Sequence, residues 1–283
     1  MAGYNIELPR KTMTTAGGDV PVLQASQDLT ERFEVTAIER DRIAPTCAEV
    51  CVEDSVNMLL NGVRVASLTM TPDELLPFAY GYLVCEGLVR SIAEVQEVAI
   101  KGTDVNVIVD SFKPDDVDLW MEIRSSGCVG VRSSWLDLEE PVKSRLKLDL
   151  QTIFSCVSTV NELAGLWRRT GGTHCSAIFD AHGGLIAYAE DIGRHNTVDK
   201  AVGKALLDGR DLSECFLVTT GRAPAGMVAK VYRAGMPVMI SNTAPLSTGV
   251  ELAQRLNMTL AGFARPPRMY VYSGSERIKE ASR

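Results

Sequence analysis

Between residues 173 and 273, short apolar runs of strand length alternate with segments in which the apolar residues have helical spacing. Strands and helices that alternate along a chain build a layered α/β domain, because the helices cover the faces of the sheet. We expect such a domain over residues 151–283. The expected strands are 173–180, 185–189, 215–220, 238–241, 259–263 and 269–272, and the expected helices are 153–167, 196–207, 224–234 and 247–256.

The first half of the chain is predicted to be a smaller, β-rich α+β domain. Two hairpins are expected there, one turning at Asn61-Gly62 and one at residues 102–104, because both turns separate strand-like runs. A helix is expected to begin with Thr71 as its N-cap and to stop at Gly87. Pro77 lies inside this segment and should bend it.

These patterns divide the chain into four parts. Residues 1–30 have few periodic apolar positions and predict a loose arm. Residues 31–123 form the expected β-rich domain, and residues 124–150 an irregular loop and linker. Residues 151–283 form the α/β domain.

Composition limits the class of protein. The 283 residues are 46% hydrophobic and 23% charged, which are the values of a globular chain. The net charge of −7 argues against broad nucleic-acid binding, which needs a basic surface. No apolar run has the length of a membrane span or a secretory signal. Seven scattered cysteines fit reduced thiols and predict a cytoplasmic protein without membrane association.

The segment Glu190–Lys200 concentrates acid, base, imidazole and amide side chains at a predicted strand-to-helix junction. Asn196 has the position of an N-cap. The N-terminus of a helix offers free backbone N–H groups and a positive dipole end, which favour phosphate. A capped surface helix with a salt-bridged first turn would give the same pattern.

Cys128 differs from the other cysteines in its neighbours. Gly127 and Gly130 flank it, and Arg124 and Arg132 lie close in sequence. Small neighbours expose a thiol, and nearby cations lower its pKa and favour the reactive thiolate. The alternative is an inert loop thiol. The other cysteines mostly fall on apolar stripes and predict packing roles.

No motif for a resident metal or a common nucleotide fold is present. His174 stands at a strand start beside Cys175, but the chain has three histidines and no Cys-x-x-Cys pair. A closed zinc site is therefore not expected, and His174 is interpreted as a hydrogen-bonded structural or pocket residue. The chain also lacks a phosphate-binding P-loop and a dinucleotide fingerprint.

Polar clusters follow three of the predicted strands. They are Thr219–Arg222, Ser241–Pro245 and Phe263–Arg268. Ligands of open α/β sheets gather at the carboxyl ends of strands. The last cluster adds an aromatic ring and two guanidinium groups suited to a phosphate or a base. Together the clusters predict a polyanionic or nucleotide-like ligand.

Several long motifs in order resemble the FdhD family, the sulfur-carrier accessory protein of formate dehydrogenase. The resemblance covers about residues 50–275. It rests on Thr-His-Cys-Ser-Ala at 173–177, the Glu190–Lys200 segment, Thr220-Gly221-Arg222, Ser241–Pro245, Gly262–Arg265 and Tyr270–Ser273. It implies a cytidine-deaminase-like α/β domain preceded by a smaller domain, and a homodimer.

The resemblance also implies a function. Family members accept sulfur from a cysteine desulfurase as a persulfide, and pass it to the molybdenum or tungsten bis-(molybdopterin guanine dinucleotide) cofactor before its insertion into formate dehydrogenase. Cys128 would carry the persulfide. The residues implied to bind the cofactor are Phe263, Ala264, Arg265, Pro266, Pro267 and Arg268, with His174, Asp191, Arg194, His195, Lys200 and Arg222 lining the same cavity.

One departure from the family pattern concerns the loop. Many members have Ser-Ser-Cys-Gly-x-Cys-Gly, whereas residues 125–131 here are Ser-Ser-Gly-Cys-Val-Gly-Val. A persulfide needs one anchoring thiol, so transfer through Cys128 alone is expected. Two alternatives remain: a cofactor-binding chaperone without sulfur chemistry, and a nucleotide hydrolase, which the missing zinc ligands disfavour.

Overall fold

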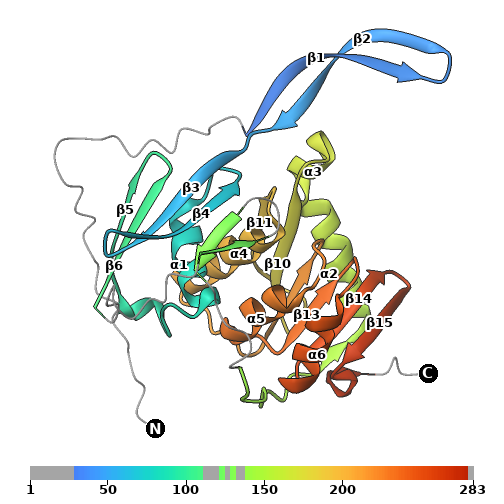
Figure 1. Cartoon of the computed structure of the whole chain (residues 1–283). Coiled ribbons are helices and arrows are strands. Elements are labelled where there is room, and N and C mark those ends of the chain that lie inside the picture. The colour runs from blue at the N-terminus through green and yellow to red at the C-terminus, as the bar shows by residue number, and fades with distance from the viewer. Residues whose placement is uncertain (1–28, 111–120, 125–127, 132–137, 280–283) are drawn as a thin grey trace.

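The structure is a computed structural model that describes residues 29–110, 121–124, 128–131 and 138–279. Within these residues, two six-stranded sheets form the body, and a separate two-stranded ribbon extends from it (Figure 1). The two sheets differ in connectivity, and the mixed α/β fold expected from the sequence is confirmed.

The N-terminal sheet packs one face on helix α1 (Leu75–Glu86). Its strands are β3 (Asp54–Leu60), β4 (Val63–Met70), β5 (Val95–Lys101), β6 (Asp104–Val109), β7 (Met121–Arg124) and β8 (Cys128–Val131), in the order β5-β6-β3-β4-β8-β7. Both predicted hairpins are confirmed. Asn61 and Gly62 join β3 to β4 with φ angles of 49° and 81°, the left-handed conformation that a tight hairpin turn requires.

The prediction for the start of helix α1 is wrong. The helix begins at Leu75 after Glu74, whose φ is 52°, and not at Pro72. Pro77 therefore lies in the first turn, where its missing N–H would have no helical acceptor, so the proline is compatible with the helix. Gly87 ends the helix in the left-handed conformation, as predicted.

The C-terminal sheet carries helices on both faces. Its strands are β10 (His174–Asp180), β11 (Leu185–Asp191), β12 (Cys215–Thr219), β13 (Val238–Ser241), β14 (Thr259–Arg265) and β15 (Arg268–Ser273), in the order β11-β10-β12-β13-β14-β15. Strands β12, β13 and β14 are parallel, and the outer pairs are antiparallel. Every predicted strand of this half is confirmed.

Two hydrophobic clusters hold the layers of this half together. Helices α4 (Arg194–Leu207), α5 (Ala225–Arg233) and α6 (Ser247–Arg255) share one cluster with one face of the sheet. Helix α2 (Leu150–Leu163) covers the other face. The single helix predicted at 153–167 is interrupted, because a short helix α3 (Gly165–Thr170) follows α2. Strands β9 (Leu148–Asp149) and β16 (Ile278–Lys279) form a small parallel pair.

The predicted loop at 124–150 is only partly irregular. Strand β8 pairs with β4 on one side and with β7 on the other, so Cys128 begins a strand of the N-terminal sheet. A strand forms here because β4 offers an unfilled edge, which the local sequence does not reveal. Residues 125–127 and 132–137, with Arg132, lie outside the described residues, as does nearly all of the predicted arm 1–30.

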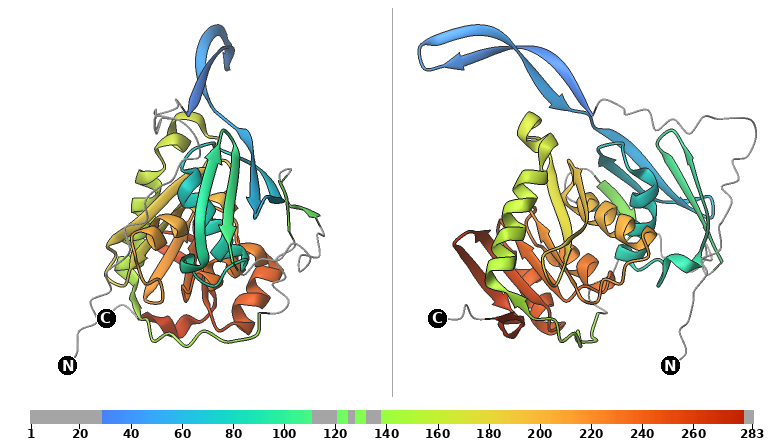
Figure 2. Two further views of the ribbon diagram at one scale, coloured as in Figure 1. Left: turned by 90° about the vertical axis from the view of Figure 1, so that its left-hand side faces the viewer. Right: turned by 180° about the vertical axis from the view of Figure 1, so that it is seen from behind.

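The sequence patterns do not predict the two-stranded ribbon. Strands β1 (Thr30–Glu39) and β2 (Arg42–Cys51) pair antiparallel over their whole length and project away from the body (Figure 2). Arg169 of α3 holds its base, through Glu49 Oε2 at 2.7 Å and Thr30 Oγ1 at 2.8 Å.

The two halves meet where α1 crosses α4. A Cβ atom at Gly81 would lie 1.8 Å from the carbonyl oxygen of Asp199, and a Cβ at Gly203 would lie 1.8 Å from that of Pro77. The two helix backbones are therefore in direct contact at two glycines. No side chain larger than hydrogen fits at either position without separating the helices.

Candidate functional site

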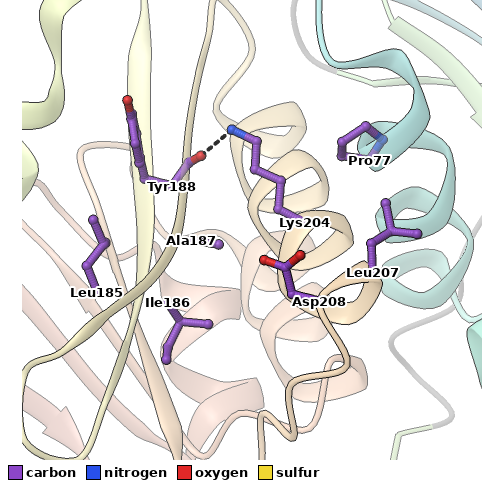
Figure 3. Close-up of a pocket in the computed structure, with 8 residues that line it drawn as sticks. All are labelled: Pro77, Leu185, Ile186, Ala187, Tyr188, Lys204, Leu207 and Asp208. Atoms are coloured by element: carbon purple, nitrogen blue, oxygen red, sulfur yellow. Dashed lines mark hydrogen bonds between the residues drawn. The ribbon is translucent and has the colours of Figure 1, made fainter. Parts of the chain in front are cut away.

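A hollow of about 420 Å³ runs along edge strand β11, and the predicted site residues do not line it (Figure 3). Lys204 crosses it to donate a hydrogen bond to the carbonyl oxygen of Tyr188 at 2.6 Å. The lining residues are Pro77, Leu185, Ile186, Ala187, Tyr188, Lys204, Leu207 and Asp208.

A second cavity, of about 270 Å³, lies between the two halves and collects several predicted residues. His174 from β10 and Arg194 and His195 from the start of α4 line it. The N-terminal half closes it with β4 and α1. The remaining lining residues are Glu53, Leu68, Thr69, Tyr82, Glu86, Ile192, Gly193, Asn196, Asp199 and Lys230.

A buried ion cluster forms one wall of this cavity. Lys230 Nζ lies 2.7 Å and 2.8 Å from the two carboxylate oxygens of Asp199 and 2.7 Å from Glu86 Oε1. The ammonium also stands 5.3 Å from the ring centroid of Tyr82. Burial raises the pKa of Asp199 to about 6 even though Lys230 opposes this shift. Burial alone would lower the pKa of Lys230, but Asp199 and Glu86 outweigh it and raise that pKa.

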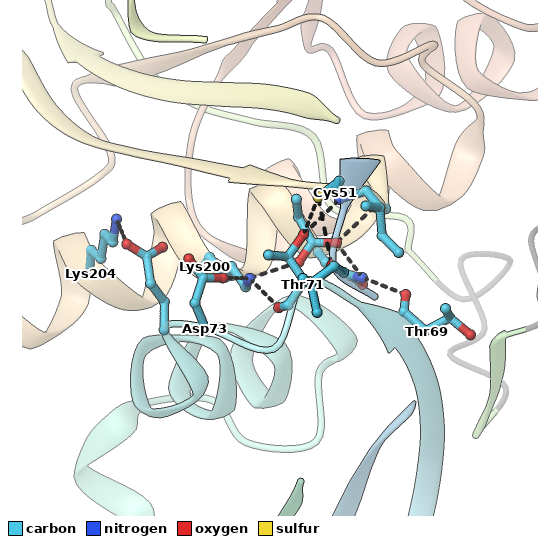
Figure 4. A network of polar contacts seen from close by, with 12 residues as sticks. Cys51, Thr69, Thr71, Asp73, Lys200 and Lys204 are labelled. Carbon is cyan, nitrogen blue, oxygen red and sulfur yellow. Dashed lines mark hydrogen bonds and ion pairs between the residues drawn. The ribbon is translucent and has the colours of Figure 1, made fainter. Parts of the chain in front are cut away.

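A second buried lysine ties the predicted junction to the N-terminal half (Figure 4). Lys200 Nζ lies 2.7 Å from Asp191 Oδ2, 2.5 Å from Asp73 Oδ1 and 2.9 Å from the carbonyl oxygen of Thr71. The side chains of Lys200 and Asp191 have no exposed surface. Burial raises the pKa of Asp191 against the opposing charge of Lys200. Asp191 and Lys200 were predicted to line the cofactor cavity, but here they support its wall from within.

The junction itself is built differently from the prediction. Gly193, not Asn196, is the N-cap of α4. Asn196 Nδ2 instead donates to Asp191 Oδ1 at 2.9 Å and to the carbonyl oxygen of Thr69 at 3.2 Å. Its amide therefore contributes to the contact between the halves, because Thr69 belongs to β4. Glu190 accepts hydrogen bonds from the first backbone N–H groups of α3, Leu166 at 2.9 Å and Trp167 at 3.0 Å.

Hydrogen bonds link the carboxyl ends of the parallel strands into one continuous edge of the sheet. The start of β10 lies at the same edge, because β10 runs antiparallel to β12. His174 Nδ1 lies 3.3 Å from Thr220 Oγ1, and the Thr243 hydroxyl donates to the carbonyl oxygen of Thr220 at 3.2 Å. Phe263 N–H donates to the carbonyl oxygen of Thr243 at 2.9 Å. Arg265 Nε donates to Asn242 O at 3.3 Å. The predicted clusters thus do adjoin, and His174 belongs both to this edge and to the cavity.

The charges of two arginines act on His174 at this edge. Burial lowers the pKa of His174, and the charges of Arg194 and Arg222 lower it further, so the ring is neutral at pH 7. Arg222 is exposed. Gly221 lies against the Arg194 side chain, because a Cβ there would be 2.7 Å from Arg194 Cβ. Neutral imidazole next to guanidinium groups suits an anionic ligand.

The Phe263–Arg268 segment is a hairpin tip between β14 and β15. Phe263 is exposed and meets Tyr270 edge-on, with ring centroids 6.0 Å apart. Arg268 lies 5.8 Å from the centroid of the Tyr270 ring. Arg265, Pro266, Pro267 and Arg268 are exposed, whereas Ala264 is fully buried and can serve only through its backbone.

The backbone of Cys128 comes close to the cavity through strand pairing. Strand β4 pairs with β8 at Ala66–Gly130 and at Ser67–Val129. One step further in the same antiparallel register, Cys128 is level with Leu68, and Leu68 lines the cavity. The first residue of β8 therefore lies beside the cavity wall.

Most other described cysteines are poor nucleophiles. Cys85, Cys156, Cys175 and Cys215 are buried, which confirms the packing role predicted for Cys85, Cys156 and Cys215. Burial raises the pKa of Cys156 and Cys175 to about 12 and that of Cys85 well above its usual value. A thiol with such a pKa is protonated at pH 7 and unreactive. Cys47 is exposed.

Lys230, Glu86 and Tyr82 were not predicted as site residues. Lys230 occupies the buried stripe of α5, next to Met227 and Val231. A charged residue on the apolar face of a predicted helix is the signal that would have identified Lys230, because lysine is almost never buried without a partner.

Two absences can be stated for the described part of the chain. No three His, Cys, Asp or Glu side chains gather there in a way that could hold a metal ion. No helix among these residues is long and apolar enough to cross a membrane.

Residues 51–279 match the model of the FdhD/NarQ family. The chain is 37% identical over 247 residues to the sulfur carrier protein FdhD of Methanothermobacter thermautotrophicus, covering 87% of this chain and 98% of that protein. It is 28% identical to the protein of the same name from Bacillus subtilis, covering 87% and 97%. A crystal structure from Desulfotalea psychrophila, described as a formate dehydrogenase accessory protein, superposes with a TM-score of 0.76 at 28% identity, covering 89% of this chain and 100% of that one.

Proposed function

This chain belongs to the FdhD/NarQ family, and from that premise we propose that it is a cytoplasmic sulfur carrier with Cys128 as its sulfur-bearing residue. A cysteine desulfurase donates the sulfur. The acceptor is the molybdenum or tungsten bis-(molybdopterin guanine dinucleotide) cofactor, which the carrier binds as a substrate before formate dehydrogenase receives it.

The position of Cys128 beside the cavity carries this proposal. The register of β8 on β4 sets the backbone of Cys128 level with Leu68, which lines the cavity together with His174, Arg194 and His195. The Cys128 thiolate attacks the terminal sulfur of the desulfurase persulfide. One S–S bond forms, the donor's S–S bond breaks, and the donor leaves as a thiolate. On delivery, the S–S bond on Cys128 breaks and the terminal sulfur forms a bond to the metal of the cofactor. Cys128 leaves as the thiolate, and the metal of this substrate supplies the two electrons that take the transferred sulfur to the sulfide level.

Intact-mass analysis after incubation with a cysteine desulfurase and free cysteine tests the carrier. Wild-type protein should gain the mass of one sulfur, and Cys128→Ala should gain none. Cys47→Ala is the matched control, because Cys47 is exposed and should be dispensable. Equal loading of Cys128→Ala and wild type would show that the sulfur is carried elsewhere.

The same variant separates a carrier from a chaperone. A protein that only escorts the cofactor would restore formate dehydrogenase activity with Cys128→Ala in a host that lacks its own carrier, whereas a carrier would not.

The hydrolase alternative requires a metal. We expect metal analysis of the purified protein to find no stoichiometric zinc, and one zinc per chain would revive that alternative.

The strand-end edge is proposed to hold the guanine nucleotide part of the cofactor. The support is the hydrogen-bonded edge that ends in Arg265 and the aromatic pair Phe263–Tyr270 beside Arg268. Arg265→Ala combined with Arg268→Ala should weaken GDP binding about tenfold or more, since charge-assisted contacts contribute about 1.5–3 kcal/mol each. Arg210→Ala combined with Lys279→Ala removes the same charge at other exposed positions and should leave affinity unchanged. Unchanged GDP affinity in the Arg265→Ala, Arg268→Ala variant would show that the nucleotide binds elsewhere.

Sulfur is proposed to pass from Cys128 without a relay through a second thiol. Cys85 and Cys156, the nearest cysteines in sequence, are buried and have raised pKa values. A variant that keeps only Cys128 should therefore still restore formate dehydrogenase activity if it folds. Failure of a soluble, folded variant, with rescue by one particular cysteine, would establish a relay.

A further inference from the structure

Thr220 is held in place by the backbone of the neighbouring strand β10. Its N–H donates to the carbonyl oxygen of Cys175 at 2.9 Å. The N–H of Cys175 in turn donates to the Thr220 hydroxyl oxygen at 3.0 Å. A backbone N–H can only donate, so the hydroxyl oxygen is the acceptor in this second bond. The hydroxyl therefore keeps its own proton for another partner.

His174 is that partner, because Nδ1 of its ring lies 3.3 Å from the Thr220 hydroxyl oxygen. Burial and the charges of Arg194 and Arg222 lower the pKa of His174, so the neutral ring carries one N–H. With this proton on Nδ1, the hydroxyl proton would have no acceptor among the described residues. Donation from the hydroxyl to Nδ1 satisfies both groups. It places the ring proton on Nε2, since the bond made by one ring nitrogen decides which nitrogen is protonated.

The Nε2–H group of His174 is available to a ligand. It has no hydrogen-bond partner in the part of the protein that the structure describes, and His174 lines the cavity between the two halves. The volume of this cavity is only about 270 Å³, and Leu68, level with the backbone of Cys128, lines it as well. A hydrogen-bond donor within the field of two guanidinium groups favours an anion.

On the basis of the proposed sulfur carriage by Cys128, we propose that the Nε2–H group of His174 donates a hydrogen bond to the Cys128 sulfur while that sulfur becomes a thiolate. When the terminal sulfur departs, the S–S bond breaks and its electron pair stays on the Cys128 sulfur. A donor already in place for this charge lowers the barrier. A neutral imidazole acts here as a hydrogen-bond donor and keeps its proton. His174 is then a catalytic residue, and Thr220 is the positioning residue that fixes its tautomer.

Nitrogen-15 NMR of the full chain with labelled histidine reads the tautomer directly. The signals of His174 are those that disappear in His174→Gln. At pH 7, Nε2 should carry the ring proton and Nδ1 should have the shift of an unprotonated nitrogen. Thr220→Ser keeps the hydroxyl and should keep this tautomer, whereas Thr220→Val should lose it. A proton on Nδ1 in the wild type would overturn the proposal.

The transfer of sulfur from loaded protein to cyanide measures the departure of Cys128. The cyanide carbon attacks the terminal sulfur, a C–S bond forms, the S–S bond breaks, and Cys128 leaves as the thiolate while thiocyanate is released. The reaction requires neither the cofactor nor formate dehydrogenase. His174→Phe should slow it about tenfold or more, because one hydrogen bond to the developing anion is lost. His174→Gln keeps an N–H donor of similar reach and should retain most of the rate.

Two further variants complete the test. His182→Phe is the matched control, because His182 is exposed in the turn between β10 and β11, and it should react as the wild type does. Thr220→Val should slow the reaction and Thr220→Ser should restore it. A wild type that takes up no sulfur would overturn the proposed function, and this role of His174 with it. Normal loading of His174→Phe, followed by an unchanged rate with cyanide, would overturn the role of His174 alone.

Discussion

Lys200 and Lys230 are both buried between two carboxylates at the junction of the two halves, but their surroundings differ. Lys200 binds Asp191, Asp73 and a backbone carbonyl, and it closes the contact between β4, α1 and α4. Lys230 binds Asp199 and Glu86 within the wall of the cavity. The first cluster holds the halves together, and the second sets the charge of the space between them. A buried ion cluster can therefore hold two parts of a protein together or form part of a binding site. The residues around the cluster, and not its composition, decide which of these roles it has.

The largest loss of stability is expected when the cluster around Lys200 is disrupted. Lys200→Met leaves Asp191 buried without its cation, so the free energy of unfolding should fall by about 3–5 kcal/mol. Lys204→Met is the control one turn along α4, where the ion pair with Glu74 is partly exposed, with side-chain exposures of 27% and 32%. It should cost less than about 1 kcal/mol. Urea unfolding measures both, and equal losses would show that Lys200 does not hold the halves together.

In the cluster around Lys230, the loss of stability caused by a substitution should depend on pH. Lys230→Met leaves Asp199 beside Glu86, and we expect a loss of about 3 kcal/mol near pH 8. The loss should be smaller near pH 5, because Asp199, whose pKa is raised to about 6, can then take up a proton. Urea unfolding of the variant at the two pH values measures this. The same loss at both would mean that Asp199 does not relieve the missing charge.

Local sequence patterns identified the elements but not these clusters. The Asn61-Gly62 turn and the alternation of strands and helices after residue 173 depend on residues that are neighbours in the chain, and both are confirmed. The partner of Lys200, Asp73, is 127 residues away, so the pair exists only once α1 crosses α4. Asn196 was predicted to cap a helix because its spacing fits, yet the nearby Asp191 and Thr69 take its amide.

The ribbon shows a second limit of sequence patterns. Hydrophobic periodicity reports burial, and residues of β1 and β2 are largely exposed on both faces in the single chain. Ile38 and Ile43, 71% exposed at the tip, weaken the alternation further. For the site, the sequence located the strand-end clusters, which the hydrogen-bonded edge does bring together. The roles of Cys128 and the hairpin arginines stay predictions.

The helix crossing offers a further test of how the halves meet. Gly81→Ala places a methyl group against the backbone of Asp199, so α1 and α4 must separate. We expect a loss of about 1–3 kcal/mol in unfolding free energy, as for other overpacked interiors. Gly226→Ala in α5 is the matched control, because its nearest neighbour would be His195 Nε2 at 3.6 Å, an ordinary contact. Alanine there should be neutral or stabilise the helix by up to about 1 kcal/mol. A neutral Gly81→Ala would show that the crossing can relax.

A last test concerns the proton on Asp199. Its pKa is about 6 in the folded chain and roughly 3.9 in an unfolded one. Between these values the folded state holds a proton that the unfolded state has released. The contribution of Asp199 to stability is therefore complete below about pH 4 and is lost as the pH rises through 6. One group of this kind changes the unfolding free energy by at most about 1.4 kcal/mol per pH unit.

Asp199→Asn should remove this slope, as measured by urea unfolding from about pH 4 to pH 7. Asp211→Asn is the control with the opposite sign. Hydrogen bonds from Ser213 lower the pKa of Asp211, so its contribution is present at high pH and is lost as the pH falls. If Asp199→Asn kept the wild-type slope, the proton taken up near pH 6 would belong to another group. The cavity wall would then carry its full negative charge throughout this range, and the two lysine clusters would differ in position only.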